Sequence, residues 1–134
     1  LTHGSSGEYG HPAHVLCHTA MLAAFEKLPG EKPLLYTFQA AFDGHPKPRS
    51  MNKNDDAHLV LDISRVMYKK LAATLCHRTQ HALFVRRPSL AAGRLVTLEE
   101  TMIGVESLHR VYPPTEGNLT DQLADLLQAS GAVL

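Results

Sequence analysis

The fold is decided by residues 11–38, which read HPAHVLCHTAMLAAFEKLPGEKPLLYTF. Pro12 suits the first turn of a helix, because the amide that proline lacks would have no partner there. Apolar residues then recur on nearly every side of a helix until Pro29-Gly30 ends the pattern, which predicts a buried helix. The apolar segment 33–38 predicts a short buried strand. This order of elements favours an α/β fold.

Two weaker patterns follow the strand. Residues 42–57 are rich in proline, lysine, asparagine and aspartate, and they predict a loop. A loop of that length in a compact domain is usually functional or disordered. Apolar residues at helical spacing predict a helix over residues 63–75, with Asp62 as its N-cap.

The rest of the chain is assigned only loosely, most of all residues 88–134. The apolar segment 82–85 predicts a strand, and residues 97–108 predict a helix interrupted by Gly104. Asn118 is expected to cap a last amphipathic helix, which carries leucines at helical spacing.

The composition limits the class of protein. A length of 134 residues fits a single domain. Thirteen basic residues balance thirteen acidic ones, and this neutral charge argues against a nucleic-acid partner. No apolar run approaches the roughly 18–20 residues of a membrane span, so no span is expected. Two cysteines, Cys17 and Cys76, are too few for a disulfide scaffold and predict a reducing, cytoplasmic location.

The beginning of the chain predicts that it is part of a longer protein. It starts at Leu1 without a methionine and enters a polar, glycine-rich turn almost at once, at residues 4–10. We therefore expect one truncated domain over residues 1–134, with its motif region at residues 1–28. The sequence carries no signal for an oligomeric state.

Three of the nine histidines lie within eight residues, at the start of the predicted helix. His14 and His18 are four residues apart and would share one helix face, and His11 lies just before the first turn. Neutral imidazole is the commonest zinc ligand, so this group suggests a metal site. A histidine can instead hydrogen-bond the first turn, and His18 can be a core residue. Tyr9 adds a candidate proton donor on the glycine-flanked turn.

The same residues resemble a known signature. Thr2-His3, the glycine turn and the segment 7–14, GEYGHPAH, are similar to the T-H-x-x-x-G-x-Y-G-H-P-D-H signature of the LmbE-like zinc deacetylases, the GlcNAc-phosphatidylinositol de-N-acetylase (PIG-L) family. Residues 70–80 resemble the later K-x-x-A…H-x-[ST]-Q helix of that family. The resemblance covers residues 1–85 and implies part of a Rossmann-like layered α/β fold.

The resemblance also implies a reaction and a cofactor. The family hydrolyses an acetamide on an N-acetylglucosamine-type sugar, with zinc or another divalent metal as the cofactor. By this resemblance His14 is a zinc ligand, His11 steadies the tetrahedral oxyanion, and Tyr9 lies over the substrate carbonyl. The implied partner is a small N-acetylated sugar.

Two departures from the family pattern weaken that expectation. Ala13 replaces an acidic residue that would orient His11. The first signature, A-H-P-D-D-E, is missing, and with it two zinc ligands and the general-base aspartate; His45-Pro46 is followed by no carboxylate and cannot replace it. We therefore expect a chain that binds zinc weakly and is inactive alone. The alternatives are a non-catalytic relative of this family and a small histidine-rich metal-binding or interaction module.

Overall fold

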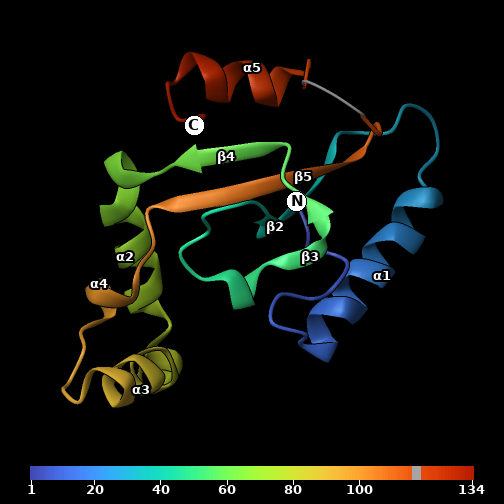
Figure 1. Cartoon of the computed structure of the whole chain (residues 1–134). Helices are drawn as coiled ribbons and strands as arrows, with labels where there is room; N and C mark the ends of the chain where they lie inside the picture. The colour runs from blue at the N-terminus through green and yellow to red at the C-terminus, as the bar shows by residue number, and fades with distance from the viewer. Residues whose placement is uncertain (116–118) are drawn as a thin grey trace. The chain divides into compact units, whose positions relative to one another are not determined.

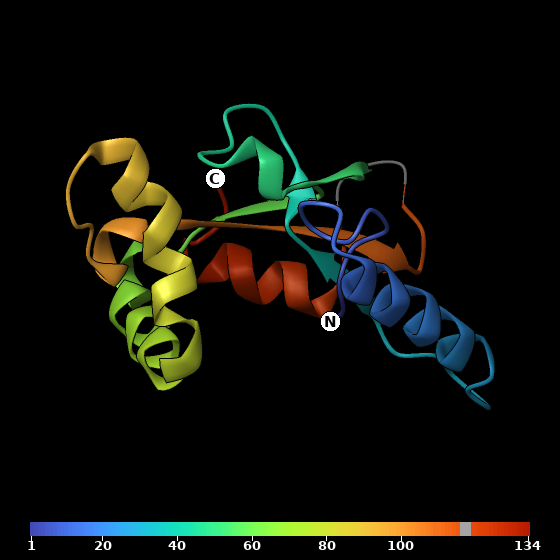
Figure 2. The same cartoon turned by 90° about the horizontal axis from the view of Figure 1, so that it is seen from below.

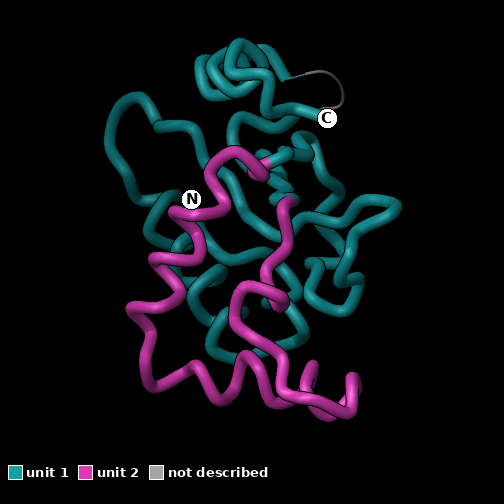
Figure 3. Tube along the Cα trace, turned by 90° about the vertical axis from the view of Figure 1, so that its left-hand side faces the viewer, with its two compact units in different colours: residues 1–62, 105–134 teal, residues 63–104 magenta. Residues whose placement is uncertain are grey.

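The computed structural model describes residues 1–115 and 119–134, which form two compact units (Figure 3). The first unit comprises residues 1–62 and 105–134, and the second comprises residues 63–104. The predicted site residues all belong to the first unit. The expectation of one truncated domain stays a prediction.

The first unit is built on a three-stranded antiparallel sheet in the order β1-β5-β4 (Figure 1). Its strands are β1 (Leu35–Phe38), β4 (Leu59–Asp62) and β5 (Val105–Tyr112). A shorter pair, β2 (Ala40–Ala41) and β3 (Asn52–Asp56), is parallel. The α/β class is confirmed. The Rossmann-like layering is not, since the larger sheet in the described residues is antiparallel.

The strand predicted over residues 33–38 is confirmed as β1, and it is buried at Leu35, Tyr36 and Thr37. The predicted loop is wrong in part, because residues 42–57 contain the short helix η1 (Pro48–Ser50) and most of β3. The β3 strand is polar in sequence, so no apolar alternation marks it. Its Asn52 is nevertheless fully buried, and that side chain proves central to the site.

Helix α1 (Pro12–Glu26) begins at Pro12 as predicted, with His11 as its N-cap. Phe25 is its one buried residue, and the Phe25 ring meets the ring of Tyr112 at 5.2 Å between centroids. The predicted burial of the whole helix is therefore wrong for this chain. A helix that is apolar on all sides cannot press every side against one sheet, so Leu16, for example, remains exposed.

Helix α5 (Gln122–Ala129) lies alongside β4 and β5 (Figures 1 and 2). Its N-cap is Asp121, which accepts hydrogen bonds from two backbone amides of the first turn. The predicted cap, Asn118, lies outside the described residues, and the helix begins later than predicted. After α5, the amide of Asp62 donates to the carbonyl of Ala132, which ties the chain end to β4.

The second unit is helical. Its elements are η2 (Ser64–Val66), α2 (Met67–Cys76), η3 (Arg78–Gln80), α3 (His81–Ala92) and α4 (Leu98–Thr101). The helix predicted over residues 63–75 is largely confirmed, but Asp62 ends β4 and does not cap that helix. Among the described residues, no helix has the length and apolar character needed to cross a membrane.

Two further predictions in this region are wrong. Residues 82–85 lie inside α3 and form no strand, because a short apolar run fits a helix as well as a strand. The helix predicted over residues 97–108 is only α4, for which Thr97 and Glu100 form a capping box. It ends at Thr101, and β5 begins directly after Gly104.

Candidate metal centre

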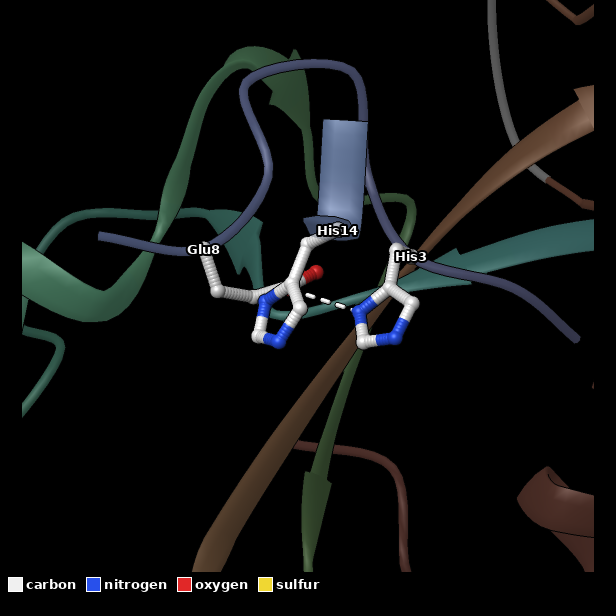
Figure 4. Close-up of side chains that lie close together, drawn as sticks. All are labelled: His3, Glu8 and His14. Carbon is white, nitrogen blue, oxygen red and sulfur yellow. Dashed lines mark hydrogen bonds and ion pairs between the residues drawn. The ribbon is translucent and has the colours of Figure 1, made fainter. Parts of the chain in front are cut away.

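Three side chains of the first unit converge on one point (Figure 4). His3, Glu8 and His14 each offer one ligand atom, and these atoms lie within 4.8 Å of one another. His3 follows Thr2, which pairs with Thr37 of β1, whereas His14 lies in the first turn of α1. The family resemblance predicted His14 as a ligand but not His3 or Glu8.

Glycines allow the turn that brings these residues together. A Cβ atom on Gly4 would lie 2.1–2.6 Å from the side-chain atoms of Asn52, so only glycine fits this close approach. Gly7 has a φ of +66°, and its carbonyl accepts a hydrogen bond from the His11 amide at 2.7 Å. The turn thereby leads directly into the start of α1.

Asn52 of β3 fixes Glu8 within this turn. The Asn52 Oδ1 atom accepts a hydrogen bond from the Glu8 amide at 3.1 Å, and its Nδ2 atom donates to Glu8 Oε1 at 2.9 Å. The same Nδ2 atom lies 2.9 Å from the Phe38 carbonyl, which it also donates to. One buried amide therefore joins the turn, β1 and β3.

Glu8 is a buried carboxylate, only 4% exposed. Its Oε1 atom also accepts the Gly4 amide at 3.0 Å, and its Oε2 atom is hydrogen-bonded to His3 Nδ1 at 2.7 Å. Burial works to raise the pKa of Glu8, but the hydrogen bonds from Gly4, Asn52 and His3 outweigh it and lower that pKa. Glu8 is thus ionised at neutral pH and contributes a buried negative charge to the cluster.

His14 brings a second imidazole to the same carboxylate oxygen. Its Nδ1 atom lies 2.6 Å from Glu8 Oε2 but outside hydrogen-bond geometry. This buried nitrogen therefore has no hydrogen-bond partner among the described residues. The rings of His3 and His14 stack with centroids 4.1 Å apart.

The cluster fits a divalent cation. Two histidines and one glutamate are one of the three-ligand sets of catalytic zinc sites, which leave the fourth position open. Ligand atoms around a tetrahedral zinc are about 3.3 Å apart, given zinc–ligand bonds of about 2.0–2.1 Å. The two imidazole nitrogens lie 2.7 Å and 2.6 Å from Glu8 Oε2, so a bound ion would require these distances to increase to about 3.3 Å, and it would give His14 Nδ1 a partner.

Tyr9 and His11 lie next to His14, so the three residues implied by the family resemblance are brought together. The His11 ring is 4.6 Å from the His14 ring, and the Tyr9 ring is 5.4 Å from it. His11 Nδ1 accepts the Ala13 amide at 3.2 Å, so the proton of the neutral ring is on Nε2. Tyr9 is 63% exposed, on a backbone with a φ of +48°.

His18 is not part of this cluster. Its Nδ1 atom is hydrogen-bonded to the backbone carbonyl of His3 at 2.9 Å, so His18 helps to hold His3 in place. Cys17 is a free, exposed thiol, as is Cys76. The sequence suggested His14 and His18, on one helix face, as a pair of metal ligands. In the structure, the two histidines of the cluster are His14 and His3.

No family model, no curated protein and no solved structure matches this chain. The resemblance to the zinc deacetylases therefore stands on its motif residues. In the structure, two of those residues, His3 and His14, lie against the carboxylate of Glu8.

Proposed function

We propose that this chain binds zinc, or another divalent cation, between His3, Glu8 and His14. We further propose that this centre belongs to an LmbE-like N-deacetylase, which hydrolyses the acetamide of an N-acetylglucosamine-type sugar. The observation that carries the proposal is the convergence of one ionised carboxylate and two imidazoles within 4.8 Å. The reaction and the Rossmann-like layering come from the motif resemblance.

In such a donor set, zinc polarises a carbonyl oxygen and lowers the pKa of its bound water. We assign His11 as the donor to the developing oxyanion, through its exposed Nε2–H. The Ala13 amide already fixes this tautomer, so a carboxylate at position 13 is not needed to orient the ring. We assign Tyr9 as a second donor, because this exposed tyrosine has its ring 5.8 Å from the His11 ring, measured between centroids.

A second candidate function is metal binding without catalysis, either as a non-catalytic relative or as a small histidine-rich module. The observation that favours it is that three ligand atoms come from residues 3–14 alone. All three candidate ligands of such a site lie within this chain. The two candidates agree on zinc and differ on hydrolysis.

Zinc binding is tested by isothermal titration of the metal-stripped chain. The sequence predicted weak zinc binding because it offered His14 as the one assigned ligand. With three candidate ligands in the structure, we expect one zinc ion to bind per chain. His3→Ala and His14→Ala should each weaken binding by at least about tenfold, since each leaves two ligands. His77→Ala is the matched control, because this exposed histidine belongs to the second unit. Zinc affinity unchanged in both site variants would refute the site.

Hydrolysis is tested by acetate release from N-acetylglucosamine conjugates. The sequence predicted an inactive chain because the A-H-P-D-D-E signature and its general base are missing; with three metal ligands present, we expect no more than slow release by the zinc-loaded chain. His11→Ala should lower kcat by a further factor of about 10²–10³ with zinc retained. Stoichiometric zinc with no acetate released would favour the metal-binding module and would reject the deacetylase.

A further inference from the structure

A cavity of about 490 Å³ opens in the first unit. That volume lies within the range of small-molecule sites. Its lining includes two basic side chains and no acidic one. The lining residues are Ser6, Tyr9, Gly10, Arg49, Met51 and Lys53.

The two basic residues come from the segment 42–57, which the sequence predicted to be a functional or disordered loop. Arg49 lies in η1 and Lys53 in β3, and both side chains are exposed. Neither forms an ion pair with any residue that the structure describes. Because Asn52 joins β3 to the Glu8 turn, Lys53 follows directly after a residue that contacts the metal centre. Two unpaired charges of one sign in the lining of one cavity favour an anion between them.

A third side chain points to a ligand at the same place. The Ser6 hydroxyl is buried, and its oxygen has no hydrogen-bond partner among the described residues. A buried hydroxyl without a partner is costly, and this one would donate its proton to an anionic oxygen in the cavity once its side chain turned toward that oxygen. Arginine in particular matches the planar fork of a phosphate or carboxylate.

Tyr9 joins this cavity to the metal centre. It lines the cavity, and its ring also meets the His14 ring edge-on at 5.4 Å. A ligand that fills the cavity therefore reaches the residues to which we assign the chemistry.

We infer that this cavity, with Arg49, Lys53 and Ser6, binds an anionic group, a phosphate or a carboxylate. Its assignment as the part of the substrate next to the acetamide rests on the proposed function.

The test is titration of the metal-free chain with inorganic phosphate, followed by backbone amide shifts in NMR. We expect the amides of Ser6, Gly10 and Lys53 to shift. The double variant Arg49→Ala/Lys53→Ala should bind phosphate at least about tenfold more weakly. A parallel titration with propionate separates the two anion types by their affinity.

The matched control is Arg86→Ala/Arg87→Ala, which removes the same charge from exposed positions of α3. Its phosphate affinity should equal that of the unmodified chain. Equal weakening in both double variants, or no shift at the cavity amides, would overturn the inference.

The outcome is independent of zinc, because the titrated protein holds no metal. A chain that binds phosphate but releases no acetate keeps the cavity and loses the deacetylase. If the deacetylase holds, the Arg49→Ala/Lys53→Ala variant should raise KM for N-acetylglucosamine 1-phosphate by a larger factor than KM for neutral N-acetylglucosamine. An equal change in KM for the two substrates would show that the cavity does not recognise the anionic group of the substrate.

Discussion

Replacing Glu8 by alanine should destabilise the protein more than any exposed substitution of the same kind. Three hydrogen bonds end on this carboxylate, from the Gly4 amide, Asn52 Nδ2 and His3 Nδ1. A hydrogen bond to a charged group contributes about 1.5–3 kcal/mol. The three share one acceptor and are not additive, so we expect Glu8→Ala to cost about 3–5 kcal/mol in total. Small domains have only about 5–15 kcal/mol of stability.

The conservative variant Glu8→Gln should cost about half as much. Its amide keeps one oxygen to accept the Gly4 and Asn52 donors, but it loses the charge and presents an NH₂ group on the side of His3 and His14. Comparing the two variants therefore separates the contribution of the side chain's shape to stability from the contribution of its charge.

The charge should also appear in the pH dependence of stability. Burial alone would raise the pKa of Glu8, but its hydrogen bonds lower it below the ordinary value of 4.5. A carboxyl with a lowered folded-state pKa stabilises the protein above its unfolded-state pKa. This contribution is lost as the pH falls from about 4.5 through the folded-state pKa, and Glu8→Gln should lack it.

The assay is urea unfolding followed by circular dichroism, at pH 7 and in steps from pH 5 to pH 3. Glu31→Ala is the matched control, because Glu31 is an exposed glutamate and should change the free energy of unfolding by less than about 0.5 kcal/mol. A cost below about 1 kcal/mol for Glu8→Ala would refute the reasoning. So would an unchanged acid dependence in Glu8→Gln.

Three further predictions use the same unfolding measurement. Asp121→Ala should lower the free energy of unfolding by about 4 kcal/mol, because Asp121 caps α5 and also pairs with buried Arg110 at 2.7 Å. The variant would leave that arginine without a counter-charge, and a loss below about 1 kcal/mol would contradict the prediction. Gly4→Ala should cost about 1–3 kcal/mol by displacing the Asn52 side chain, and it should also weaken zinc binding in a calorimetric titration. Burial lowers the pKa of His58, so the unfolded chain binds a proton at this histidine more readily than the folded chain as the pH falls below about 6.5, and the free energy of unfolding decreases. His58→Gln should therefore flatten the dependence of this free energy on pH between pH 7 and pH 5, by at most about 1.4 kcal/mol per pH unit.

Local sequence signals predicted what depends on neighbouring residues alone. A proline in the first turn predicted the start of α1, and an apolar run predicted β1. Such signals fail where a segment fits two structures equally well. Residues 82–85 are apolar enough for a strand, yet they lie inside α3.

The candidate site shows the same division. The histidine spacing and the family signature identified Tyr9, His11 and His14 as neighbours, because they belong to one turn and the helix that follows it. Glu8 lies in the same turn, and an acidic residue flanked by glycines and histidines was the signal that could have found it.

The sequence by itself determined the residues of the motif, the turn that carries them and the helix that this turn begins. Only the tertiary structure decided which of them meet. Asn52, 44 residues after Glu8, fixes that carboxylate between His3 and His14, and the same strand carries Lys53 to the anion cavity. The physical reason is that a buried charge is stable only when distant parts of the chain supply its hydrogen bonds, and no local pattern reveals which parts those are.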